Sequence, residues 1–302
     1  MTTESGIRLE FAQFGHFDSF DIIRSVTSMV GVANADLPTP IVTGLKTMYY
    51  VDSNVIEKQT YYYRVRCWRG TTSFVSTEVK VIAVLDDPHY DKLVCALRMD
   101  TVVVVDRKGG SGFSNNGRAI LDTTNTLASF PTLGFSSANH FFDVNNPSLM
   151  FGTGNFCIRS WVRLNTYPGG GGDNDMSIVD LQNGFLLYCH NTTGELQMWD
   201  GSAGVGLNGR SAGILPLNTW CFVEASRTAG VFRLFLNGNL LGSVNYTRNL
   251  NSVGFIRVAG STYNSATRAM RGNIARFSVY KGWGGNTANY TPPVEPEYLH
   301  WV

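Results

Sequence analysis

Hydrophobic and polar residues alternate along this chain in short runs, and the pattern is clearest near residue 235. Phe232, Leu234 and Leu236 occupy every second position, so they share one face of an extended strand. Asn237 and Gly238 follow directly, and this pair favours a two-residue type I′ turn because both residues accept a positive φ. Apolar residues resume after the turn. The sequence therefore predicts a β-hairpin here.

The remaining strand-like segments are also short and separated by turn-forming residues. No stretch carries a sustained apolar period of 3.6 residues, and the chain is rich in Gly, Tyr and Phe, with 32, 13 and 18 of each. Such a pattern favours antiparallel sandwiches over a parallel sheet with crossover helices. The turn clusters lie at residues 34–36, 52–54, 109–112, 115–117, 169–172 and 237–238. We therefore expect an all-β protein.

The 302 residues are enough for two domains. A strand-like run over residues 78–84 ends at the sequence Leu-Asp-Asp-Pro of residues 85–88, and a new strand begins at Leu93. Pro88 blocks a continuous central strand, because proline lacks a backbone donor, and it stiffens the joint. We expect a first domain over residues 1–86 and a second over residues 87–302.

An aromatic strand marks the first segment. In the run 60–66, Tyr61, Tyr63 and Val65 share one face, and further strand-like runs cover residues 20–25, 43–45 and 49–52. Together these runs resemble a fibronectin type III module. The resemblance implies that one of the tyrosines makes the tyrosine-corner hydrogen bond found in such sandwiches.

Three stretches of the second segment carry another resemblance. They are residues 154–164 around Trp161, residues 218–238 from Trp220 to the Asn-Gly turn, and residues 272–293. Their order and composition are similar to those of a laminin G-like, concanavalin A-like jelly roll. The resemblance implies two stacked curved sheets, with binding sites on the concave face or on the loops at the edges.

The two modules in succession resemble structural proteins of tailed bacteriophages. This resemblance implies a virion protein of the fibre or appendage type, in which the first module attaches or spaces. The second module would bind a host-surface glycan or a partner protein. An alternative within the same class is a decoration protein that stabilises the capsid or tail. The expected partners are other virion proteins and further copies of the chain.

Charge and hydropathy exclude several other partners. The 24 Lys and Arg residues balance 23 Asp and Glu, for a net charge of +1, so no basic field attracts nucleic acid or an anionic membrane. The start MTTESGIRLEF lacks the basic and apolar regions of a signal peptide. Apolar runs such as residues 102–105 fall far short of the ~20 residues of a membrane span. We expect synthesis in the host cytoplasm, no membrane insertion and residence in the virion.

The cysteines give no sign of a disulfide framework or a zinc site. They are five in number, and none lies at a Cys-x-x-Cys spacing. We expect reduced, buried thiols at Cys67, Cys95, Cys157, Cys189 and Cys221.

The sequence also lacks the patterns of catalysis. A glycosidase needs two carboxylates about 5–9.5 Å apart, yet no strand carries acids at alternating positions, and Glu224 stands alone in its strand. The histidines His16, His89, His140, His190 and His300 are scattered, and the glycine-rich loops lack the Lys-Ser/Thr of a phosphate loop. We expect no enzyme and no cofactor. The rival from another class is a polysaccharide-degrading enzyme, which release of reducing sugars would reveal.

A rim calcium is the metal hypothesis that the laminin G-like resemblance raises. Where that family carries acids, this chain has Ala275 and Arg276, and a cation would meet a positive charge. Loop-stabilising Asx turns explain the other oxygen-bearing side chains, and we expect no metal. Those side chains are Asp143, Asn145, Asn146, Asp173 and Asp175.

Aromatic side chains beside loops are the remaining candidates for a ligand site. Trp283 lies between two glycines and is expected to be the most exposed, although an anchor packed into the sandwich edge is an equal alternative. Trp161 and Trp220 are assigned to the core. Tyr280 and Asn286 are further neighbours of such loops. The predicted glycan-binding residues are Trp283, Tyr263, Trp199, Asp200 and Asn264.

Overall fold

Regular structure in this protein is almost entirely β. The computed structural model describes residues 6–13, 15–56, 59–83, 87–114, 119–136, 140–167, 175–251, 255–263 and 267–293. Within them, helix is limited to two short 3-10 turns, η1 (Pro147–Leu149) and η2 (Arg210–Gly213). No helix in this described part is long and apolar enough to cross a membrane. The predicted all-β fold class is confirmed.

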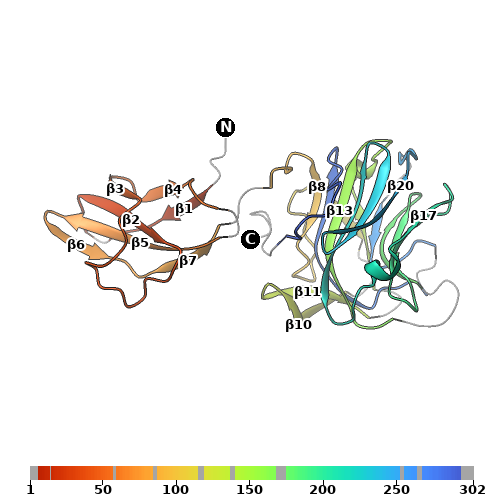
Figure 1. Ribbon diagram of the computed structural model, residues 1–302, viewed down its shortest axis with the longest axis horizontal. Helices are drawn as coiled ribbons and strands as arrows, with labels where there is room; N and C mark the ends of the chain where they lie inside the picture. The colour runs from red at the N-terminus through yellow and green to blue at the C-terminus, as the bar shows by residue number, and fades with distance from the viewer. Residues whose placement is uncertain are drawn as a thin grey trace. The chain divides into compact units, whose positions relative to one another are not determined.

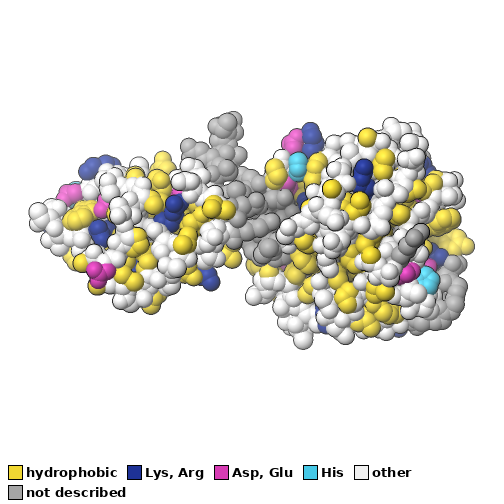
Figure 2. All heavy atoms as spheres, in the orientation of Figure 1, with side chains coloured by type: hydrophobic (Ala, Val, Ile, Leu, Met, Phe, Trp, Pro, Cys, Tyr) yellow, Lys and Arg dark blue, Asp and Glu magenta, His cyan; other side chains and the backbone are white. Residues whose placement is uncertain are grey.

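The chain divides into two compact units, one within Met1–Asp87 and the other within Pro88–Glu295. Figure 1 shows the strands of each unit. On the face drawn in Figure 2, charged side chains are scattered among hydrophobic and uncharged ones, in keeping with the near-zero net charge of the sequence.

The first unit is a small two-sheet sandwich. Strands β1 and β4 form one sheet, and the order β3-β2-β5-β6, with β7 also paired to β5, forms the other. The strands are β1 (Ile7–Glu10), β2 (Ser19–Ser25), β3 (Val42–Leu45), β4 (Tyr49–Asp52), β5 (Thr60–Arg69), β6 (Thr72–Val75) and β7 (Val79–Ile82).

The aromatic strand β5 supplies much of the core of the first unit. Tyr61 and Tyr63 are buried, and Val65 packs against the same cluster, as the alternating pattern predicts. The Ile56 backbone N–H donates to the Tyr61 hydroxyl at 2.9 Å, five residues upstream. This bond has the form of a tyrosine corner, so the prediction that one tyrosine makes it is confirmed.

A buried carboxylate joins the two sheets of the first unit. Asp52 of β4 is 2% exposed. Its Oδ2 accepts hydrogen bonds from Arg24 Nη1 of β2 at 2.9 Å and from the Tyr63 hydroxyl of β5 at 2.7 Å. The cluster closes one edge of the sandwich.

The second unit is a larger sandwich with two main sheets (Figure 1). Within the described residues, the eight-stranded sheet has the order β10-β11-β22-β13-β18-β19-β20 with β8 paired to β22, and the seven-stranded sheet has the order β17-β16-β15-β14-β21-β12-β9. Strands of the former are β8 (Leu93–Leu97), β10 (Ile120–Leu127), β11 (Phe130–Phe135), β13 (Phe156–Leu164), β18 (Trp220–Thr228), β19 (Val231–Leu236), β20 (Asn239–Asn245) and β22 (Gly272–Lys281). Strands of the latter are β9 (Gly112–Ser114), β12 (Phe142–Asn145), β14 (Met176–Leu181), β15 (Leu186–Cys189), β16 (Leu196–Asp200), β17 (Val205–Asn208) and β21 (Ile256–Val258).

The core lies between these two sheets. Phe232, Leu234 and Leu236 point into it, and the predicted hairpin is confirmed: Asn237 and Gly238 have φ values of +49° and +77°, and β19 pairs with β20. All five cysteines are free thiols, and four of them are buried as expected. The expectation is wrong for Cys67, which is only partly buried because it lies near the end of β5 in the smaller sandwich.

The outer face of the eight-stranded sheet is also buried in part. The segment after β22 packs across it, and Tyr290 contacts Phe235 with ring centroids 5.5 Å apart. Trp161 packs at 5.2 Å on Phe222 of this outer face, and Trp220 Nε1 donates to the Thr126 carbonyl. Both tryptophans were assigned to the core, and this assignment is wrong, since they lie half-buried on the outer face. The outer face of this sheet is also partly covered, so its strands carry apolar residues on both faces, and the sequence does not show which face is the core.

Candidate functional site

The candidate site lies on the outer face of the seven-stranded sheet. Directly paired positions place Asp180, Leu186, Trp199 and Gly206 side by side across β14, β15, β16 and β17. The neighbouring positions Leu181, Leu187 and Met198 belong to the core. Because strand side chains alternate between faces, the first four residues form one outward row.

Trp199 is held in this row by glycines. A Cβ added to Gly206 would come within 2.7 Å of the Trp199 ring, and one added to Gly201 would lie 3.3 Å from its Nε1. The indole therefore lies close against the backbone of β17, where a side chain larger than hydrogen would displace it. It remains 47% exposed, so part of the ring is available to a ligand.

Asp180 organises the loop opposite Trp199. It is 7% exposed, and its Oδ2 accepts hydrogen bonds from the Ser261 hydroxyl, the Thr262 hydroxyl and the Thr262 backbone N–H at 3.0, 3.0 and 2.6 Å. Ser261 Oγ in turn accepts the Tyr263 N–H at 3.1 Å. Tyr263, 80% exposed, is thus carried by a loop that a buried carboxylate holds in place.

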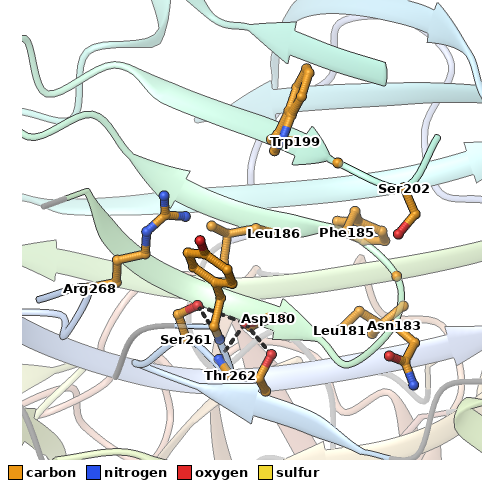
Figure 3. Close-up of a pocket in the computed structure, with 13 residues that line it drawn as sticks. Asp180, Leu181, Asn183, Phe185, Leu186, Trp199, Ser202, Ser261, Thr262 and Arg268 are labelled. Atoms are coloured by element: carbon orange, nitrogen blue, oxygen red, sulfur yellow. Dashed lines mark hydrogen bonds between the residues drawn. The ribbon is translucent and has the colours of Figure 1, made fainter. Parts of the chain in front are cut away.

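These elements enclose a pocket of about 460 Å³, within the ~300–1,000 Å³ range of small-molecule sites. In Figure 3, Trp199 lies at the top, Arg268 at the left and Ser202 at the right, and Asn183 lies at the lower right, beyond the Asp180 network. The Arg268 guanidinium lies 5.8 Å from the Tyr263 ring centroid. Leu186 and the buried core residues Leu181 and Phe185 add to the apolar lining that the two aromatic rings provide.

Two of the predicted residues, Trp199 and Tyr263, line this pocket. Asn264 lies outside the described residues. Asp200 is not part of the pocket lining. It is 1% exposed, and its oxygens accept the Tyr246 hydroxyl at 2.6 Å, the Ser202 and Ala203 N–H groups at 3.0 and 3.1 Å, and the Arg248 guanidinium. It therefore fixes the turn after Trp199. Burial, together with this carboxylate, holds the pKa of Tyr246 above its usual value.

Trp283 follows β22 of the eight-stranded sheet, and its ring is packed against side chains of that unit. Its ring stacks on His89 at 4.1 Å, meets Tyr280 edge-on at 4.8 Å, and lies 4.9 Å from the Arg159 guanidinium. The expectation that Trp283 is the most exposed of these aromatics is wrong, because neighbouring strands and the start of the second unit close over it. The edge-anchor alternative describes its environment.

Glu224 is buried beneath the segment that follows Trp283. It is fully buried and accepts the Asn286 N–H, the Asn286 side-chain amide and the Tyr290 hydroxyl at 2.9, 3.0 and 3.1 Å. Burial, with this carboxylate beside it, raises the pKa of Tyr290. Glu224 thereby anchors the segment that follows Trp283 to β18.

Three of the five oxygen-bearing side chains considered for calcium have other partners. Both oxygens of Asp143 accept a bidentate pair from Arg257 at 2.7 and 2.9 Å. Asn146 caps η1 through the Ser148 N–H, and Asp175 accepts the Asn191 N–H at 3.0 Å. Asn145 is exposed at the end of β12, and Asp173 lies outside the described residues.

Five residues of the pocket lining were not predicted from the sequence: Asp180, Asn183, Ser202, Thr262 and Arg268. One signal was present: Asp180 interrupts the otherwise apolar end of Met176–Leu181, and an acid in a buried strand needs donors from elsewhere. Nothing in the sequence indicated that those donors come from residues 261 and 262.

The two antiparallel sheets of the second unit form a concanavalin A-like jelly-roll sandwich. Residues 136–283 match a laminin G family described as the Concanavalin A-like lectin/glucanases superfamily. No curated protein sequence matches the chain.

Solved structures share this fold. The binding domain of Paraclostridial Mosquitocidal Protein 1 is similar at a TM-score of 0.52 and 15% identity, over 65% of this chain and 50% of that one. The HCR/D F1240A mutant is similar at a TM-score of 0.50 and 17% identity, over 65% and 50%. The likeness thus spans about half the length of these structures, and at such identity it shows the fold alone.

Proposed function

We propose that the second unit binds a glycan in the pocket that Trp199 and Tyr263 flank. The observation that carries the proposal is the exposure of these two aromatics, 47% and 80%, on rims fixed by buried carboxylates. Aromatic rings present an apolar face on which sugar C–H groups can stack. Hydroxyl, amide and guanidinium groups beside them supply the polar contacts that orient a ligand.

We propose binding without catalysis. Glycoside hydrolysis uses a pair of carboxylates about 5–9.5 Å apart, and Asp180 is the only acid among the described residues that line the pocket. Its Oδ2 already accepts three hydrogen bonds. A reducing-sugar assay on any polysaccharide that the protein binds tests this, and sugar release abolished by Asp180→Asn would favour the enzyme.

A printed array of bacterial-surface and animal oligosaccharides tests glycan binding. We expect Trp199→Ala and Tyr263→Ala to lose binding with little change in melting temperature, because both side chains are exposed. Trp283→Ala is the matched control: it removes a packed tryptophan, so we expect about 3 kcal/mol less stability and unchanged binding. Loss of binding in Trp283→Ala alone would move the site to the other sheet.

The role of the whole chain is proposed from the resemblance of its two modules to structural proteins of tailed phages. The first unit, proposed to be fibronectin type III-like, would attach or space, and the second would face outward on a fibre or appendage. The tyrosine corner at Tyr61 supports the first assignment. The role as a decoration protein remains the alternative. Immunogold labelling of intact particles separates the two, and absence of the chain from particles contradicts both.

A further inference from the structure

Arg248 connects two rims of the pocket that are separate in sequence. Its Nη1 donates to Asp200 and, at 3.1 Å, to the Gly184 carbonyl, while Nη2 donates to the Asn183 carbonyl at 2.9 Å. Asn183 and Gly184 form the turn between β14 and β15, and Asp200 begins the turn after Trp199. One guanidinium therefore sets the spacing between these turns.

Arg248 is itself held from the opposite sheet. Its backbone carbonyl accepts Arg227 Nη1 at 2.7 Å, and Arg227, fully buried on β18, donates its other N–H groups to the Gly152 and Gly154 carbonyls. Tyr246, two residues before Arg248, donates to the same Asp200 carboxylate. The segment after β20 is therefore hydrogen-bonded both to the eight-stranded sheet and to the two pocket rims.

We propose that Arg248 is a positioning residue for the glycan pocket, acting through Asp200 and the turn at residues 183–184 rather than by touching the sugar. The proposal rests on the proposed glycan-binding function. A site whose walls are fixed before binding loses less conformational freedom when the ligand arrives, so an arginine that aligns two rims contributes affinity without a contact of its own.

Lysine in place of Arg248 separates this role from a merely structural one. The planar guanidinium presents several N–H donors in fixed directions, whereas an ammonium is a compact charge on a flexible chain. Lysine can keep the ion pair with Asp200, yet it cannot hold that carboxylate and both carbonyls in the same geometry. We therefore expect the substitution to preserve stability and lose alignment.

The experiment compares full-length Arg248→Lys and Arg248→Ala with Arg24→Lys and Arg24→Ala. Arg24 is a matched control, because its side chain is 21% exposed against 23% for Arg248, and each pairs with a carboxylate that is at most 2% exposed. The probe is the oligosaccharide that gives the strongest array signal with the unchanged protein. Its dissociation constant is measured by calorimetry beside each melting temperature.

We expect both Ala variants to melt at similarly lowered temperatures and both Lys variants to melt near the unchanged protein. Affinity should fall about tenfold, or ~1.4 kcal/mol, in both Arg248 variants and in neither Arg24 variant. Full affinity in Arg248→Lys, or equal losses in the Arg24 variants, overturns the proposal.

A second measurement follows the pocket without ligand. The indole N–H resonance of Trp199, identified by its absence in Trp199→Phe, should shift or broaden in Arg248→Lys and stay unchanged in Arg24→Lys. An unchanged resonance in Arg248→Lys also overturns the proposal. If the unchanged protein binds no glycan on the array, the proposed function fails, and the indole resonance alone decides whether Arg248 positions the rim.

Discussion

Asp52 in the first unit and Asp200 in the second are held by the same kinds of side chain. Asp52 accepts from Tyr63 at 2.7 Å and from Arg24, and Asp200 accepts from Tyr246 at 2.6 Å and from Arg248. In each case the carboxylate ends a strand of one sheet, while the tyrosine and the arginine come from the other sheet or from the segment that follows it. Both clusters therefore tie the two layers of a sandwich together.

The two clusters differ in the further carbonyl groups that their arginines bind. Besides Asp52, Arg24 donates to the Asn54 carbonyl at 2.6 Å, two residues after Asp52. All acceptors of Arg24 in this first cluster therefore lie at or just after the end of β4. Arg248 instead reaches the Asn183 and Gly184 carbonyls of a different hairpin. Both clusters of carboxylate, tyrosine and arginine join two layers, but only the cluster around Asp200 also supports a pocket rim. This difference follows from where each cluster lies in its sandwich.

The largest effect is expected when either carboxylate is removed. Asp52→Ala and Asp200→Ala each leave an arginine and a tyrosine without their acceptor, and breaking such a buried pair lowers the free energy of unfolding by about 3 kcal/mol. Denaturant unfolding of the full chain measures the loss. Glycan affinity should fall only in Asp200→Ala, and an equal fall in Asp52→Ala would erase the distinction between the clusters.

Removing one hydroxyl should cost less. Tyr63→Phe and Tyr246→Phe each delete a hydrogen bond to a charged group, worth about 1.5 kcal/mol. Burial, with the neighbouring carboxylate, raises the pKa of both tyrosines in the folded protein. The unfolded chain therefore releases these protons first, and stability should fall as the pH rises above about 10. Unfolding curves between pH 8 and 11 should show a weaker decline in both Phe variants.

Gly206→Ala tests the seat of Trp199 with a smaller effect on stability. The added Cβ would lie 2.7 Å from the indole, so the ring must shift, at a cost of about 1 kcal/mol. We expect glycan affinity to fall while the fold persists. Gly112→Ala in the same sheet is the control, because its Cβ would make ordinary contacts with the Asn145 carbonyl oxygen at 3.8 Å and the Asn145 Cβ at 3.9 Å. Equal affinity in the two variants would mean that the indole does not contact the ligand.

The last effect, confined to acid pH, concerns Asp122, a carboxylate held by amide and backbone N–H donors. Burial alone would raise the pKa of Asp122, but hydrogen bonds from Asn125, Asn273 and Thr124 lower it to about 2. Since the unfolded value is about 3.9, this contribution is present above pH 4 and is lost as the pH falls toward 2. Asp122→Asn should flatten stability across that window in acid unfolding. A variant as acid-sensitive as the unchanged protein would place the titration elsewhere.

Alternation along the chain was sufficient for the fold class and for local detail. Two-residue periodicity predicted the β19–β20 hairpin, and the Asn237-Gly238 pair predicted its turn, because both signals come from neighbours in sequence. The face of Tyr61, Tyr63 and Val65 followed from the same rule. Trp161 and Trp220 did not, because periodicity separates two faces of a strand without telling which neighbour covers each.

The sequence by itself determined that this protein is an all-β chain with a jelly roll in its second part, and it marked Trp199 and Tyr263 as aromatics beside loops. Only the tertiary structure decided that these two share a pocket, that Trp283 is packed on the other sheet, and that Asp200 and Arg248 work behind the rim. The physical reason is that strand patterns are set over a few residues. Donors to Asp180 and Asp200 include groups from positions 46 to 82 residues away, and that pairing exists only once the tertiary structure has formed.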